Sequence, residues 1–137
     1  MKISLAQIID TFHVSETNFK KGLSELWRHY YLKVLLIAGL IINGVEWFLA
    51  VFVVLRIKEE IIALHHNIYF GINLIGEPRQ IFFIPLLGFI IIIINTIFSY
   101  LVKEDDDFFM YVFAATSALV NFFLLLGLGS IIMINFR

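Results

Sequence analysis

Cysteine is missing from this chain of 137 residues, and charged residues are scarce. Without a thiol, the protein has no disulfide, no thiolate metal site and no cysteine nucleophile. Only 15% of the residues are charged and 61% are hydrophobic, a balance unlike that of a soluble domain of this length. The formal net charge of −1 lacks the basic excess that nucleic-acid binding requires. We therefore expect no nucleic-acid partner and look to the lipid bilayer instead.

Three hydrophobic runs account for the shortage of charge: residues 34–55, 81–102 and 108–136. The second and third runs contain no charged residue, and the first contains only Glu46. A helix rises about 1.5 Å per residue, so each run is long enough to cross the roughly 30 Å of bilayer hydrocarbon. The sequence predicts an all-α integral membrane protein with three transmembrane helices.

Residues 1–33 form an amphipathic region before the first span. Apolar side chains recur there at helical spacing, in two short stretches separated by Ser15 and Thr17, with basic residues on the other face. We predict two short helices, the second at the membrane interface with Trp27, Tyr30 and Tyr31 as anchors at headgroup depth. The alternative is a helix packed on another protein.

Two connections of opposite character join the spans. Residues 56–80 are apolar, with a β-prone stretch at 68–70 and turn signals at Gly71, Gly76 and Pro78, so we expect a structured, partly embedded loop. Residues 103–107, with the sequence KEDDD, form a short acidic turn. A turn this short requires the second and third spans to be an antiparallel hairpin.

The basic residues near the spans favour one orientation. Six lie on the side shared by the N-terminus and the second loop, against four on the side of the first loop and the C-terminus. The positive-inside rule then predicts a cytoplasmic N-terminus. The residues counted are Lys2, Lys20, Lys21, Arg28, Lys33 and Lys103 against Arg56, Lys58, Arg79 and Arg137.

One segment carries a family resemblance. Residues 64–76 read LHHNIYFGINLIG, followed by Pro85-Leu86-Leu87-Gly88 and by Asn95 within the second span. This pattern resembles uncharacterised small multi-spanning membrane proteins of bacterial candidate phyla, over about residues 64–100. The resemblance implies a multi-pass protein of a bacterial inner membrane, and it implies no particular activity.

Polar residues in the three spans predict a belt at mid-membrane. Asn43 and Glu46 lie on one helical face with Gly39 and Ala50, and each span offers an asparagine beside small residues. A carboxylate at this depth costs about 2.5 kcal/mol or more unless it is protonated or has a partner. Small residues allow close helix approach and interhelical hydrogen bonds. The predicted belt comprises Asn43, Glu46, Asn95, Ser117 and Asn121.

Two functions are consistent with this belt. In the first, the hydrogen bonds of the belt hold the helices together in a structural or assembly subunit of a homo-oligomer or larger membrane complex. In the second, Glu46 is the site of an oligomer that conducts protons or small cations. No Lys, Arg or His lies in a span to form a proton relay with Glu46. A transporter also normally needs more than three transmembrane helices. We favour the structural function.

Catalytic and metal-binding patterns are weak. The chain contains no Gly-rich phosphate loop, GxSxG or HExxH, and the span serines have no His at their depth, so we expect no enzyme and no cofactor. His65 and His66 with Glu59, Glu60 and Glu77 are the only candidate metal ligands, and their spacing matches no zinc signature. Adjacent residues of an extended segment point to opposite sides, so we expect no metal.

Overall fold

The computed structural model describes residues 27–57, 61–67, 71–102 and 107–136. The predicted N-terminal amphipathic helices lie almost entirely outside these residues, as do the β-prone stretch 68–70 and most of the acidic turn. Six elements follow one another along the chain: α2 (Tyr30–Arg56), β1 (Ile62–Asn67), β2 (Gly71–Gly76), the 3₁₀ helix η1 (Pro78–Phe82), α3 (Phe83–Val102) and α4 (Asp107–Asn135).

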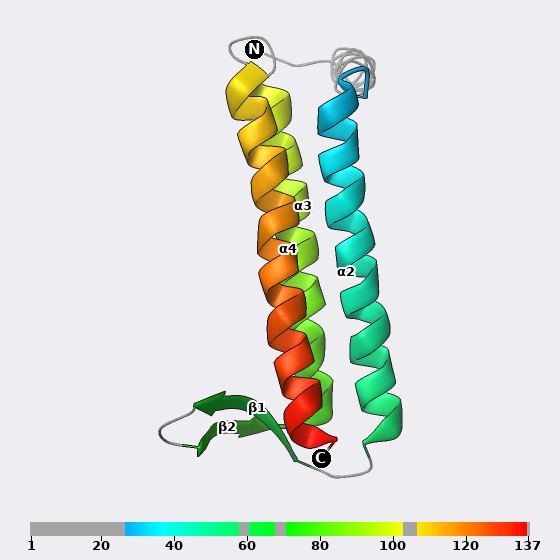
Figure 1. Cartoon of the computed structure of the whole chain (residues 1–137), viewed down its shortest axis with the longest axis vertical. Coiled ribbons are helices and arrows are strands. Elements are labelled where there is room, and N and C mark those ends of the chain that lie inside the picture. Colours follow the sequence, from blue (N-terminus) through cyan, green and yellow to red (C-terminus); the bar gives the residue numbers. More distant parts are fainter. Residues whose placement is uncertain (1–26, 58–60, 68–70, 103–106, 137) are drawn as a thin grey trace, which may run out of the picture.

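Three long helices lie side by side and confirm the predicted transmembrane fold (Figure 1). Each is long and apolar enough to cross a membrane, as the sequence predicts. α2 and α4 run in the same direction and α3 runs against both, so α3 and α4 form the expected antiparallel hairpin (Figure 1). The protein is a multi-pass membrane protein.

The helix ends differ slightly from the predicted spans. α2 begins at Tyr30, so the predicted aromatic anchors Tyr30 and Tyr31 belong to the first span's helix and not to a separate amphipathic one. The second span is entered through η1, which Pro78 opens at a position where its missing N–H costs no hydrogen bond. Asp107 stands in the first turn of α4, where a negative charge is favourable against the helix dipole.

The buried face of each helix repeats every seven residues. Successive buried positions on α2 alternate between four and three residues apart, and those of η1 and α3 do the same. α4 follows this alternation except for one step of seven residues, from Asn121 to Leu128. A repeat of seven, being slightly less than two straight turns, is typical of helices packed with a left-handed supercoil. The buried residues are Leu32, Leu36, Gly39, Asn43, Glu46, Ala50 and Val53 on α2, Ile81 on η1, Pro85, Gly88, Ile92, Asn95 and Ser99 on α3, and Met110, Ala114, Ser117, Asn121, Leu128 and Ile131 on α4.

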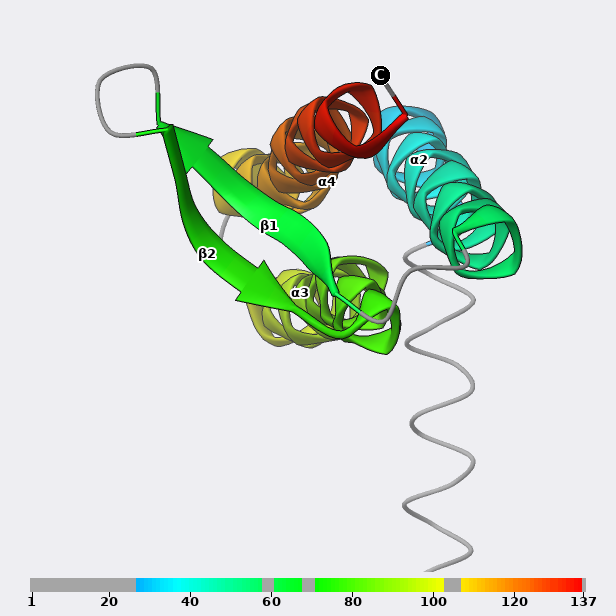
Figure 2. The same cartoon turned by 90° about the horizontal axis from the view of Figure 1, so that it is seen from below.

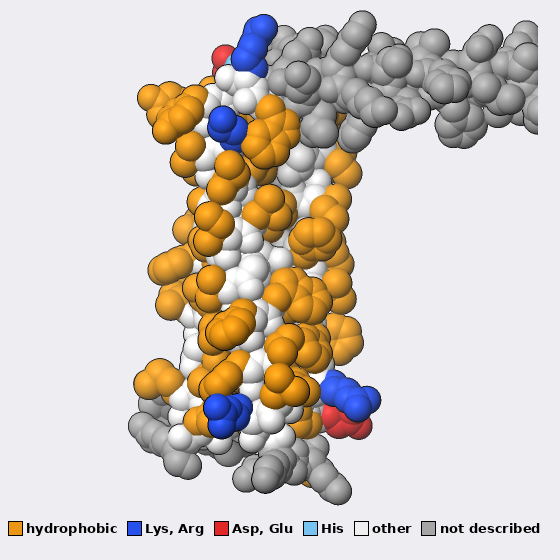
Figure 3. Space-filling model, turned by 90° about the vertical axis from the view of Figure 1, so that its right-hand side faces the viewer, with side chains coloured by type: hydrophobic (Ala, Val, Ile, Leu, Met, Phe, Trp, Pro, Cys, Tyr) orange, Lys and Arg blue, Asp and Glu red, His pale blue; other side chains and the backbone are white. Residues whose placement is uncertain are grey.

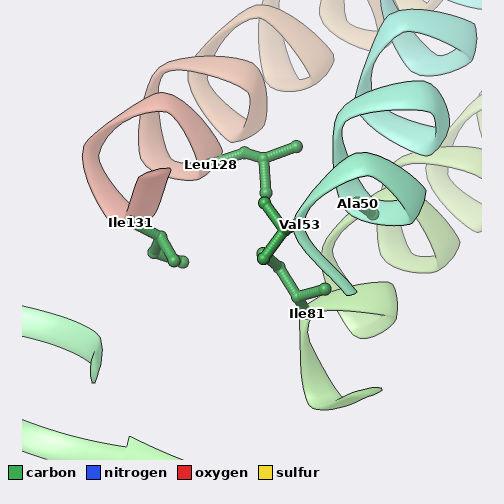
Figure 4. Close-up of a cluster of buried hydrophobic side chains, with 5 residues drawn as sticks. All are labelled: Ala50, Val53, Ile81, Leu128 and Ile131. Carbon is green, nitrogen blue, oxygen red and sulfur yellow. The ribbon is translucent and has the colours of Figure 1, made fainter. Parts of the chain in front are cut away.

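These repeats place the helices in one register. Each buried residue of α2 shares a layer with the α4 residue 78 positions later, as Asn43 does with Asn121. The contact of Ser99 with Met110 and that of Gly88 with Asn121 set the register between α3 and α4. Toward the C-terminal ends of α2 and α4, the apolar layers contain Ala50, Val53, Ile81, Leu128 and Ile131 (Figure 4). A second apolar cluster, at the other end, contains Leu32, Leu36, Met110 and Ala114.

The outer surface of the bundle is apolar along its length. Hydrophobic side chains cover the face shown in Figure 3, whereas Lys and Arg side chains stand near its two ends. Many apolar residues of the three helices are more than 40% exposed, among them Phe48, Leu87 and Phe123. Such a surface suits contact with lipid chains.

The loop contains a β-hairpin whose strands lie on either side of the predicted β-prone stretch 68–70. Gly71 and Gly76, predicted as turn residues, are instead the first and last residues of β2. β1 and β2 pair antiparallel, with irregularities of register next to His65. The hairpin lies across the end of the bundle, beside the ends of α3 and α4 (Figures 1 and 2). Ile62 and Ala63 are buried against the bundle, so this part of the loop is packed and not a solvated linker.

Asn135, near the end of α4, fastens this hairpin to the bundle. Its Oδ1 accepts a hydrogen bond from the Ala63 N–H at 2.9 Å, and its Nδ2 donates to the Ala63 carbonyl at 2.8 Å. The same Nδ2 donates to the carbonyl of Ile131, one turn back on α4. The side-chain amide thus bonds β1 as a neighbouring strand would, and it closes the outer edge of β1 at Ala63.

Candidate functional site

Three polar side chains meet at the centre of the bundle: Asn43 and Glu46 from α2, and Asn121 from α4. Asn43 is 3% exposed, and Glu46 and Asn121 are completely buried. Asn43 and Asn121 are close to the midpoints of their helices and share a layer, with Glu46 one turn farther along α2. We call these three residues the polar cluster.

Asn43 joins all three helices. Its Nδ2 donates to the backbone carbonyl of Pro85 at 2.8 Å, to Oδ1 of Asn121 at 3.1 Å and to Oε2 of Glu46 at 3.2 Å. A side-chain amide has two hydrogens, so three acceptors must share them. One residue of α2 therefore holds both α3 and α4.

Backbone carbonyls decide which way each amide of the cluster points. Asn121 Nδ2 donates to the carbonyl of Ser117 at 2.8 Å and to that of Gly88 at 3.4 Å. Because a carbonyl can only accept, the nitrogen of Asn121 must face those two groups, and its oxygen is left to face Asn43. The nitrogen of Asn43 is oriented in the same way by the Pro85 carbonyl of α3. Glu46 Oε2 is therefore offered a donor and acts as an acceptor.

The cluster is packed so closely that α3 needs a glycine beside it. A Cβ atom at Gly88 would lie 2.8 Å from Asn43 Nδ2 and 3.1 Å from Glu46 Oε2, and closer still to Asn121 Oδ1. Distances below about 3 Å force a neighbour to move, and these neighbours are held by hydrogen bonds. Gly88 thus provides the space in which the amides and the carboxyl group meet.

One atom of the cluster has no partner. Glu46 Oε1 is buried, and no described residue forms a hydrogen bond with it. An unpaired buried polar atom generally costs about 1–3 kcal/mol. Among described residues, two hollows of about 800 and 300 Å³ lie near the hairpin, and no member of the polar cluster lines either.

The side chains of three of the five predicted belt residues hydrogen-bond to one another, and those of Asn95 and Ser117 do not join them. Asn95 is buried, but no hydrogen bond within the described residues joins it to the cluster. The register of the antiparallel helices α3 and α4 pairs Gly88 with Asn121. Asn95 therefore lies about 10 Å farther along α3, in the layer of Leu36 and Ala114. The expectation that all three asparagines lie at one depth is therefore not met.

Ser117 takes part through its backbone and not its side chain. Its Oγ donates to the carbonyl of Phe113 at 3.3 Å within α4, while its own carbonyl accepts from Asn121. Thr96 likewise bonds within its helix, to the carbonyl of Ile92. The hydroxyl of Ser99 does cross between helices, donating to the Met110 carbonyl at 3.1 Å.

The sequence reasoning missed three contributors. The carbonyl of Pro85 and the space at Gly88 are backbone features that no side-chain pattern of α2 or α4 reveals. Asn135 was overlooked because it stands alone near the end of the third span. A helix leaves its last carbonyls unpaired, so a side-chain donor at the end of a long apolar run was the signal that could have identified Asn135.

The predicted interfacial anchors stand at the start of α2 and are exposed. Trp27, Tyr30 and Tyr31 are 47%, 67% and 71% exposed, and the two tyrosine rings meet edge to face, with centroids 5.6 Å apart. Aromatic residues at a span's end suit headgroup depth. Among the described residues, no group of three His, Asp or Glu side chains is placed to share a metal ion.

Comparison with known proteins gives no information about the function of this chain. No protein-family model, no curated protein and no solved structure matches the chain. The resemblance to small multi-spanning proteins of bacterial candidate phyla stays a prediction. Any functional proposal must therefore rest on the polar cluster, the hairpin and the surface of the bundle.

Proposed function

We propose that this protein is a structural or assembly subunit of a homo-oligomer or larger membrane complex, without catalytic activity. The observation that carries the proposal is the enclosure of Glu46 within a single chain. A group that binds or passes an ion must be reached from water or from a neighbouring subunit. Glu46 is instead completely buried and accepts a hydrogen bond from Asn43.

The hydrogen bonds of the polar cluster support a holding role. They connect side chains of α2 and α4 with carbonyls of α3 and α4, which is how polar residues strengthen helix association in lipid. The Glu46 carboxyl group serves this role as the acceptor of the Asn43 hydrogen bond. The described hydroxyls in the core, Ser99 and Ser117, bond to carbonyls and not to a base, which also favours a non-enzymatic role.

We place the protein in a bacterial inner membrane with its N-terminus in the cytoplasm. The excess of basic residues on that side supports the orientation. Among the described residues, Arg28 and Lys33 flank the start of α2, while Arg56 and Arg79 are near the hairpin. With this orientation the hairpin lies on the outer side of the membrane.

Native mass spectrometry in a mild detergent tests the proposal. A structural subunit should appear as a defined oligomer or retain co-purifying membrane proteins. A strict monomer over the whole range of protein concentrations would contradict the proposal. The companion measurement is ion flux into proteoliposomes, which we expect to stay at the level of empty vesicles.

Proton or small-cation conduction by an oligomer is the second candidate. The unpartnered Oε1 of Glu46 favours it, because an intramembrane carboxyl with unused bonding capacity is a place where a proton or cation can bind. If this function holds, wild-type proteoliposomes carry flux and Glu46→Gln abolishes it. Flux that is absent, or unchanged by Glu46→Gln, contradicts conduction through this residue.

A further inference from the structure

The hairpin has one closed edge and one open edge. Asn135 bonds both the N–H and the carbonyl of Ala63, on the outer side of β1. Within the described residues, no comparable partner covers the outer edge of β2. The backbone hydrogen bonds found outside helices and strands involve Lys33, Ile57, Gln80 and Phe136, and none involves β2.

The pairing of the strands identifies a residue on this open edge. Ala63 is paired with Ile75 across the hairpin. In an antiparallel pair, two opposite residues either bond to each other or both point their N–H and carbonyl groups outward. Because the groups of Ala63 point outward to Asn135, those of Ile75 point outward on the other side. Ile75 therefore presents at the edge of β2 a donor and an acceptor for which the described part of the chain supplies no partner.

The sequence of β2 lacks the residue types that usually block an edge. Protein edges are usually blocked by a charge, a proline or a covering segment. β2 reads GINLIG and contains neither a charge nor a proline. Leu74 and Ile75 are adjacent, so their side chains leave opposite faces of the strand, and they are 55% and 61% exposed. At these two positions, both faces of the strand are exposed.

The direction of the hairpin suits a second copy of the same chain. The strands lie across the end of the bundle and do not continue along the helices (Figure 1). Two copies inserted the same way in one bilayer are related by a two-fold axis along the membrane normal. Such an axis reverses every direction in the membrane plane, so the two β2 strands meet antiparallel. A strand without charge can pair with its own copy without repulsion.

We propose that β2 pairs with β2 of a second copy, forming a four-stranded antiparallel sheet at one face of the membrane. This contact rests on the proposed structural function and specifies how the subunits associate. Pairing supplies hydrogen-bond partners to the Ile75 edge and covers apolar side chains of both copies. The occupant is thus a second copy, and not an unrelated peptide or the lipid headgroups.

Cysteine cross-linking tests the contact directly, because the natural chain has no cysteine. Single cysteines are placed in turn at positions 71–76 of the full chain and oxidised in dilute proteoliposomes. Strand pairing brings Cβ atoms within disulfide range only near the two-fold axis. We expect a sharp maximum within 71–76, at least tenfold above Leu55→Cys, a control that is 78% exposed at the same end of the bundle. A flat profile equal to the control would overturn the contact.

A blocking variant separates failure of the contact from failure of the proposed function. Ile75→Lys adds a charge to the open edge and changes no described hydrogen bond, and Leu55→Lys is its matched control. We expect the wild type and Leu55→Lys to be dimers or larger by native mass spectrometry, and Ile75→Lys to dissociate. An oligomer that Ile75→Lys leaves intact overturns the β2 contact alone. A wild type that is monomeric overturns the proposed function as well.

Discussion

Two regions of the bundle pack on the same seven-residue repeat and differ in what fills it. In the middle, Asn43 and Asn121 face Gly88, whereas nearer the hairpin Ala50 and Leu128 lie with Ile81. The apolar region tolerates any neighbour of suitable size. The polar region accepts one arrangement only, because each amide must find the carbonyl that orients it. Packing holds the helices together, and the polar cluster decides their relative positions along the membrane normal.

The largest loss of stability is expected for Gly88→Ala. The added Cβ would collide with Asn43 and Asn121 and separate the hydrogen-bonded groups. Overpacking together with a broken buried bond should lower the free energy of unfolding by about 3 kcal/mol. Unfolding by SDS in mixed micelles measures this loss. Gly127→Ala is the control, since a Cβ there meets nothing within 4 Å; equal losses in the two variants would show that the cluster is not tightly packed.

Asn43→Ala should have the next largest effect. It removes the only described hydrogen bond of the Glu46 carboxyl and the link from α2 to the Pro85 carbonyl. We expect a loss of about 2 kcal/mol in the same assay, near the top of the range for polar contacts in membrane bundles. If Asn43→Ala costs less in a Glu46→Leu background, the two residues are coupled. Additive losses of stability in the double variant would show that Asn43 and Glu46 are not coupled.

Leu128→Ala tests the apolar side of the comparison. Leu128 is completely buried, yet the unfolded helix also keeps its leucine among apolar lipid chains. Only packing contacts are lost, so we expect about 1 kcal/mol, well below the 2–5 kcal/mol typical of water-soluble cores. A loss above that of Asn43→Ala would reverse our order for the two regions.

Asn135→Ala should loosen the hairpin without weakening the bundle. Both hydrogen bonds to Ala63 disappear, which costs about 1 kcal/mol locally. Hydrogen exchange at the Ala63 amide should accelerate roughly fivefold, by the same conversion of free energy to rate. Exchange in the middle of α2 and α4 should not change. Unaltered exchange at Ala63 would show that β1 is held by packing alone.

The smallest effect is expected for Glu46→Gln. Glutamine has nearly the same shape, and its oxygen can still accept the hydrogen bond from Asn43. The free energy of unfolding should therefore change by less than about 0.5 kcal/mol, as for a substitution that leaves a hydrogen bond in place. A loss comparable to that of Asn43→Ala would mean that the carboxyl group itself, and not merely an acceptor, is required.

Much of the site could be predicted from α2 alone and little of it from α3. Asn43 and Glu46 stand three residues apart, so any helix brings them to one face. Asn121 could be matched to them because it is central in its own span. Asn95 was matched for the same reason, and the register of the α3–α4 hairpin places it in another layer. Position within a span is a weak guide to depth when a turn fixes the pairing.

By itself, the sequence determines that three helices cross a membrane, because the length of an uncharged apolar run is a local property. It also determines the antiparallel order of the last two spans, since five residues cannot return across a bilayer. Only the tertiary structure decides which carbonyls orient the amides, why position 88 must be glycine, and how Asn135 closes one edge of the hairpin. These features depend on contacts between residues 33 to 78 positions apart, which register and packing set together.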